Sequence, residues 1–184
     1  PAMVEFIRLK AASEANVRVL PIGTITKGRQ GLELAELALM AEKGAVAFSD
    51  DGSPVADGEM MRRALEYSKI VRRPIIEHCE DMSLTNGGEA NEGPVTTWLG
   101  LNPIPRASEE CMVARNLVLA IRTRGRLYLA RLSTELSISL FNWAKGYGAD
   151  ITAEVAPHHL ALTEALLAGY ETYAKVNPPL RGEE

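Results

Sequence analysis

Short apolar runs alternate with amphipathic stretches along most of the chain, and this alternation predicts strands that alternate with helices. The apolar runs begin near residues 17, 45, 74, 127 and 151, which gives separations of 28, 29, 53 and 24 residues. The separations of 28, 29 and 24 residues each fit one strand and one helix, and the separation of 53 residues fits such a unit with an insertion. The predicted strand regions are VRVLPIGTI (17–25), AVAFSDD (45–51), PIIEHCED (74–81), LYLARLST (127–134) and ITAEVAPHHL (151–160).

Residues at helical spacing fill the gaps between these runs. The pattern predicts helices over residues 32–42, around residues 61–65, over residues 108–124 with Ser108 as N-cap, and around residues 136–143. From about Met82 to Arg106 the sequence is rich in Gly, Asn and Pro. This stretch predicts an irregular insertion, of the kind that often forms a lid or binding loop.

Regular alternation without hairpin signals predicts an α/β fold with parallel strands. Polar residues gather where each predicted strand ends, and chemistry at several strand ends is typical of a TIM-type (β/α) barrel rather than a doubly wound sheet. No glycine-rich nucleotide-binding loop follows a strand. A complete barrel takes typically ~250 residues. We therefore expect one domain over residues 1–184, an incomplete barrel of about five strands, with residues 82–106 as an insertion or lid-like loop within it.

Composition narrows the function classes. Hydrophobic residues make up 46% of the chain, which is enough for a core, and the net charge of −4 is spread without a basic stripe that would suit nucleic acid. There is no apolar run long enough for a membrane span, and no signal-peptide pattern. Cys79 and Cys111 lack a CxxC pairing and are expected to be buried small residues in a reducing compartment. Without a membrane span or a signal peptide, we expect a cytoplasmic protein. We also expect homo-oligomers, because an incomplete barrel leaves apolar edges uncovered.

Asp51 and His78 follow consecutive predicted strands, so a carboxylate and an imidazole should lie at neighbouring points of one rim. Such a pair can bind zinc or a similar ion. Two simpler interpretations stay open. Asp51 could belong to a tight turn with the glycine that follows it, and His78 could be a structural histidine paired with neighbouring acids.

Other polar positions have two interpretations each. His158 and His159 are adjacent on a predicted strand, so at most one should face a barrel centre, and both could instead anchor a loop through hydrogen bonds. The prolines after Asn177 should fix its amide in place, where it could recognise a ring imide or carboxylate, or simply form a turn. Lys27 and Arg29 could bind an anion, but exposed loop cations usually bind nothing specific, and we assign them no catalytic role.

Taken together, LPIGTITKGRQG, AVAFSDDGSPV, IIEHCED, APHHL and KVNPPLR resemble successive landmarks of bacterial type I dihydroorotases of the amidohydrolase superfamily. The resemblance runs from about residue 17 to the C-terminus and makes the strands the third to seventh of the family barrel. It implies the zinc-dependent interconversion of dihydroorotate and N-carbamoyl-L-aspartate in pyrimidine biosynthesis, in which zinc activates water. It also implies that Asp51 and His78 are metal ligands and that Asn177 contacts substrate.

Three departures from the family pattern predict only a partial metal site. The His-x-His-x-Arg segment of the first family strand and the aspartate of the last strand have no counterpart in this sequence. Where the family has a histidine, the sequence has Arg131, which offers no lone pair to a metal. We expect Arg131 to replace the charge of the metal and to pair with Asp51. Alternatively, Arg131 turns toward solvent or reaches a loop carboxylate.

Two functions follow from this resemblance. The first is a hydrolase of a cyclic amide that is inactive as this chain alone and holds zinc only with ligands from elsewhere. The second is a non-catalytic subunit that stabilises aspartate carbamoyltransferase, which Arg131 favours. A relative acting on hydantoins or allantoin is a third candidate, less favoured because those enzymes usually carry a carboxylated lysine where this chain has Asp51.

Overall fold

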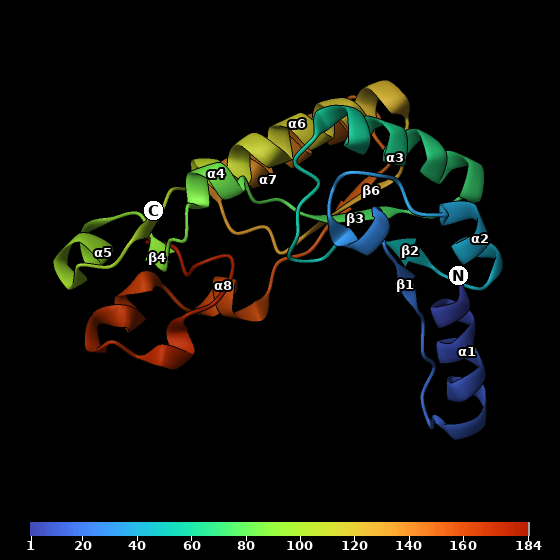
Figure 1. Cartoon of the computed structure of the whole chain (residues 1–184). Coiled ribbons are helices and arrows are strands. Elements are labelled where there is room, and N and C mark those ends of the chain that lie inside the picture. Colours follow the sequence, from blue (N-terminus) through green and yellow to red (C-terminus); the bar gives the residue numbers. More distant parts are fainter. Residues whose placement is uncertain (184) are drawn as a thin grey trace.

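The computed structural model describes residues 1–183 and contains one five-stranded parallel sheet (Figure 1). The strands lie side by side in the order β1-β2-β3-β6-β7, so neighbours in the sheet follow one another along the chain apart from β4 and β5. This confirms the predicted α/β class with five parallel strands. The strands are β1 (Ile22–Gly23), β2 (Ala47–Phe48), β3 (Ile75–His78), β6 (Leu127–Ala130) and β7 (Ile151–Ala153).

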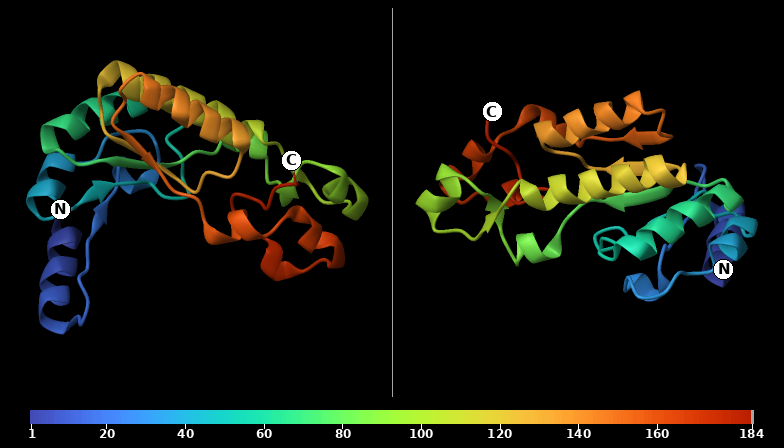
Figure 2. Two further views of the ribbon diagram at one scale, coloured as in Figure 1. Left: turned by 180° about the vertical axis from the view of Figure 1, so that it is seen from behind. Right: turned by 90° about the horizontal axis from the view of Figure 1, so that it is seen from above.

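Among residues 1–183, the helices that connect the strands cover one face of this sheet and leave the other open (Figures 1 and 2). Figures 1 and 2 show α3, α6 and α7 lying along that face. Asp57 caps α3 by accepting a hydrogen bond from the Met60 amide at 2.7 Å, and Thr134 caps α7 by accepting one from the Ser137 amide at 3.2 Å. The helices that connect the strands are α2 (Leu37–Glu42), α3 (Gly58–Val71), α6 (Ala107–Thr123) and α7 (Glu135–Gly146).

Successive side chains of a strand point to opposite faces of the sheet, and over the first three residues of β3 and β6 burial alternates accordingly. Ile75, Leu127 and Ile151 share one register row and are fully buried against the helices. On the other face Ile22 is 52% exposed, and Tyr128 is only partly buried. This open face is the one that would point to the centre of a closed barrel.

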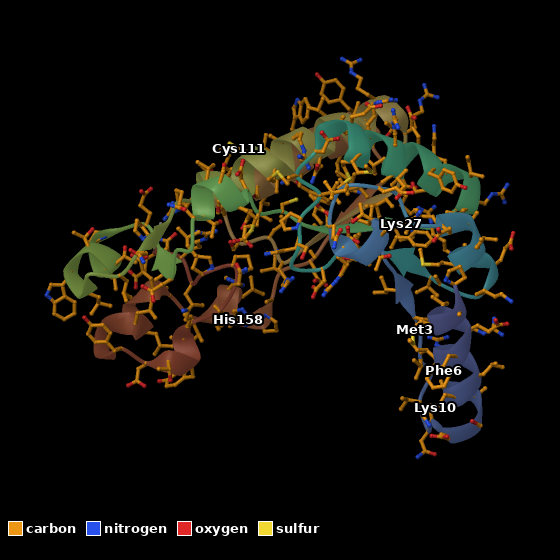
Figure 3. The ribbon with its side chains drawn as sticks, in the orientation of Figure 1. Met3, Phe6, Lys10, Lys27, Cys111 and His158 are labelled. Atoms are coloured by element: carbon orange, nitrogen blue, oxygen red, sulfur yellow. The ribbon has the colours of Figure 1, made fainter. Side chains whose placement is uncertain are left out.

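The remaining elements lie outside this layer. Helix α1 (Ala2–Glu14) projects from the sheet and buries only Val4, and Figure 3 shows Met3, Phe6 and Lys10 along it. At the opposite end, a second apolar cluster joins the segment after β3 to the C-terminal segment. The elements at this end are α4 (Met82–Thr85), β4 (Ala90–Asn91), α5 (Pro94–Leu99), β5 (Pro103–Ile104), α8 (Pro157–Ala161), η2 (Glu164–Gly169) and η3 (Thr172–Ala174).

Several predicted boundaries are wrong. The first strand covers only two of residues 17–25, because Val17 and Leu20 are exposed and pack against no second layer. The last strand stops at Ala153, and Pro157 opens α8, since proline suits the first turn of a helix. The first predicted helix begins at residue 37 rather than 32.

The stretch from 82 to 106 is not irregular throughout but contains two short helices and a two-stranded parallel sheet. Of the two cysteines expected to be buried, Cys79 is buried and Cys111 on α6 is exposed (Figure 3). Within residues 1–183, the longest helices are too short or too polar to cross a membrane.

Candidate functional site

Three of the predicted site residues meet at the carboxyl edge of the sheet. Asp51 follows β2, His78 ends β3 and Arg131 follows β6, and β3 lies between the other two strands. All three line one cavity of about 680 Å³ on the open face. The expected ion pair is present: Arg131 Nη2 lies 3.2 Å from Asp51 Oδ1, with 34% of the arginine side chain and 75% of the aspartate side chain exposed.

The backbone turns sharply at both residues of this ion pair. Asp51 has a φ of 52° and Arg131 a φ of 58°, in the left-handed region that side chains disfavour. Each such residue costs of order 1 kcal/mol or more, and strained residues of this kind cluster at binding and catalytic sites. The amide of Asp51 donates to Ser49 Oγ at 2.9 Å, which fixes the turn.

His78 and Asn177 share one carboxylate. His78 Nε2 lies 3.2 Å from Glu80 Oε2, and Asn177 Nδ2 donates to the same oxygen at 3.0 Å. The hydrogen bond from His78, and then that from Asn177, lower the pKa of Glu80 to about 2. Because an ionised carboxylate only accepts, His78 Nε2 carries the proton and, in the neutral ring, Nδ1 keeps its lone pair. That Nδ1 is buried and has no hydrogen-bond partner among the described residues.

The other two histidines lie together on α8 (Figure 3 labels His158), with ring centroids 4.4 Å apart. His159 Nε2 lies 3.0 Å from the carbonyl oxygen of Pro178, to which it can donate. Burial lowers the pKa of His159, which favours the neutral ring. This contact fits the loop-anchoring interpretation, since it fixes the segment that carries Asn177.

The two loop cations of the first βα loop differ. Lys27 Nζ lies 2.5 Å from Glu33 Oε1, and this ion pair raises the pKa of the lysine. Arg29 lines the cavity and is exposed. Within residues 1–183 no hydrogen bond or ion pair of its side chain is formed.

Buried acidic side chains that the sequence reasoning missed hold the loops at this edge. Asp50 accepts from the amides of Ile25 at 2.8 Å and Thr26 at 3.1 Å, which fixes the loop after β1. Glu77 accepts from the amide of Val55 at 2.8 Å, which fixes the loop after β2. Both are acids inside apolar strand regions, and that position was the available sequence signal.

A third carboxylate does the same from a helix. Glu109 on α6 is 3% exposed and accepts from the amides of Ser133 at 2.9 Å and Thr134 at 3.2 Å, just after Arg131. Arg181 Nη2 lies 3.5 Å from Glu109 Oε2, and its Nε donates to Ser133 Oγ at 3.0 Å. The C-terminal segment is thereby joined to the loop after β6.

The donor set does not form a metal site. Within residues 1–183 no group of three or more His, Cys, Asp and Glu side chains could hold a metal ion. His78 Nδ1 could serve as one ligand, but the carboxylate of Asp51 is paired with the guanidinium of Arg131. A structural zinc site has four protein ligands and a catalytic one typically three.

Comparison with known proteins agrees with the geometry. A family model described as "Dihydro-orotase-like" matches residues 1–137. The chain is 51% identical over 180 residues to a dihydroorotase of Pelotomaculum thermopropionicum (98% of this chain, 42% of the relative). It is 45% identical over 183 residues to a dihydroorotase of Caldicellulosiruptor saccharolyticus (100% and 43%).

The chain thus spans less than half the length of these curated relatives. Among solved structures, an L-hydantoinase (dihydropyrimidinase) from Arthrobacter aurescens superposes with a TM-score of 0.74 at 20% identity, covering 97% of this chain and 42% of that one. A D-hydantoinase superposes with a TM-score of 0.72 at 18% identity, covering 99% and 42%. These two likenesses show the fold, which is part of the barrel of those hydrolases. The chain belongs to the dihydroorotase-like family.

Proposed function

We propose that this chain forms the central part of a dihydroorotase-type barrel and does not hydrolyse dihydroorotate by itself. The family reaction interconverts dihydroorotate and N-carbamoyl-L-aspartate in pyrimidine biosynthesis. The observation that carries the proposal is the ion pair at the rim, where Arg131 lies 3.2 Å from the carboxylate of Asp51. Arg131 offers no ligand atom and shares the carboxylate of Asp51, so the three rim residues supply fewer ligands than the three typical of a catalytic metal site.

In this proposal the chain contributes binding and orientation. Glu80 fixes the His78 ring through Nε2 and the Asn177 amide through Nδ2, so both side chains have a defined direction. The carbonyl oxygen of the Asn177 side chain stays available to accept from a ring imide of the substrate. The zinc of the family, when bound, would supply activated water and polarise the amide.

A second candidate is the non-catalytic subunit that stabilises aspartate carbamoyltransferase. The specific observation in its favour is again the ion pair of Arg131 with Asp51, at a position where the resemblance implies a metal-binding histidine in the active family members. A protein with only this structural role needs the barrel and its surface but no metal.

The test is dihydroorotate hydrolysis and carbamoyl aspartate cyclisation with added zinc, measured on this chain and on the natural polypeptide that contains it. We expect no turnover from residues 1–184. Turnover by this chain alone would contradict the proposal. If the natural polypeptide is also inactive and co-purifies with aspartate carbamoyltransferase, the second candidate holds; if it is active, the second candidate fails.

A further inference from the structure

The guanidinium of Arg131 is paired with the carboxylate of Asp51, which a metal ion at this rim would need as a ligand. The ion pair joins the ends of β2 and β6 across the end of β3, where His78 lies. A guanidinium carries a permanent positive charge and cannot coordinate a metal. A divalent ion on Asp51 would therefore share its ligand with a fixed cation and would be repelled by it.

The rest of the cavity offers no surplus of negative charge. Besides His78, the charged side chains that line it are two arginines, Arg29 and Arg131, and two carboxylates, Asp51 and Glu154. The carboxylate of Glu154 already accepts from Tyr128 Oη at 2.7 Å. With as many arginines as carboxylates, these lining side chains attract a divalent cation less than a lining rich in carboxylates would.

The backbone around Arg131 holds its side chain in this place. The left-handed φ of 58° turns the chain at the strand end, and Leu132 directly after it is fully buried. The amides of Ser133 and Thr134 are bound by Glu109. The backbone that carries Arg131 is therefore anchored from the covered side of the sheet. Its guanidinium reaches Asp51 on the open side.

We propose that Arg131 excludes divalent metal ions from the position between Asp51 and His78, with its guanidinium serving as the resident cation of the site. This inference rests on the proposed function, because it concerns the same rim. It goes beyond that function by assigning the misfit of a divalent ion at this rim to one side chain, Arg131, which brings a fixed positive charge and no ligand atom.

The test is a titration with cobalt(II), followed by visible absorption and by metal content after dialysis, on the natural polypeptide that contains this chain. The variants are Arg131→His and, as a matched control, Arg29→His, which makes the same change at an arginine of the same cavity. We expect Arg131→His to bind cobalt at least about tenfold more tightly than the unmodified protein, the smallest effect usual for changes around a metal site. Arg29→His should bind like the unmodified protein, and adding Asp51→Asn to Arg131→His should remove the gain.

Equal cobalt binding by Arg131→His and Arg29→His would overturn the inference. So would one equivalent of cobalt on the unmodified protein that Asp51→Asn abolishes, and this second measurement decides the question even if Arg131→His does not fold. No readout depends on turnover, so a gain of cobalt in a protein that stays inactive supports this inference separately from the proposed function.

Discussion

Replacing Glu77 by glutamine should change how the stability of the protein depends on pH. The Glu77 side chain is 1% exposed on the helix-covered side of β3, and burial raises its pKa from 4.5 to about 8 against the opposing hydrogen bond from the Val55 amide. A raised pKa means that the folded state holds this proton more tightly than the unfolded state does. The stabilising contribution is therefore complete below pH 4.5 and is lost as the pH rises through about 8.

The size of the effect follows from the difference between the two pKa values. Each pKa unit corresponds to about 1.4 kcal/mol, so a shift from 4.5 to about 8 gives a loss of roughly 5 kcal/mol across this pH range. Glutamine has nearly the same shape, keeps an oxygen that can accept from the Val55 amide, and does not ionise. We expect Glu77→Gln to flatten the pH dependence of unfolding by up to about 1.4 kcal/mol per pH unit between pH 5 and 8.

Urea unfolding at pH 5, 6, 7 and 8 measures this slope directly. Glu66→Gln is the matched control, because Glu66 is an exposed carboxylate on α3 that pairs with Arg62. The control should keep the slope of the unmodified protein. If Glu77→Gln also keeps it, Glu77 is ionised in the folded state at neutral pH and the reasoning from burial fails.

Three further predictions concern packing, charge and metal. Gly125→Ala should destabilise the fold by about 1–3 kcal/mol in urea unfolding, since a Cβ there would lie 2.6 Å from the carbonyl oxygen of Leu65; Gly146→Ala, with nothing within 4 Å, should not. Arg181→Met should cost about 3–5 kcal/mol, because it leaves the buried carboxylate of Glu109 without its cation; a loss below ~1 kcal/mol would mean that the pair is dispensable. Treatment with EDTA should leave unchanged the thermal unfolding midpoint of this chain, measured by circular dichroism. A clear drop in that midpoint would reveal a bound structural metal.

The sheet could be predicted from the sequence because each strand lies in an apolar run and pairs with at least one parallel neighbour. The strand ends at Asp51, His78 and Arg131 were placed correctly for the same reason, since parallel neighbours bring their carboxyl ends to one edge. The ion pair with Asp51 was one of two alternatives that the sequence left open for Arg131, and the structure shows that it forms.

Other features depend on packing that the sequence does not display. Helix α1 was missed because only Val4 of its residues is buried, so no apolar face marks it. The apolar run from Val17 to Leu20 looked like strand but has no layer against which to pack. The carboxylates that hold the loops bind amides 22 to 25 residues away, and such pairs become visible only in three dimensions.

The supports of the rim are separate from the residues that face the cavity. The loop after β2 is held through Val55 by the buried Glu77, and the loop after β6 is held through Ser133 by the buried Glu109. Asp51 and Arg131 project from these loops on the open face and contribute little to their fixation, because a partly exposed ion pair stabilises by at most about 1 kcal/mol. A change of residue at position 131 can therefore alter the ligand set without loss of the fold. This explains how the chain keeps a barrel segment like those of the hydantoinases while an arginine stands among its rim residues.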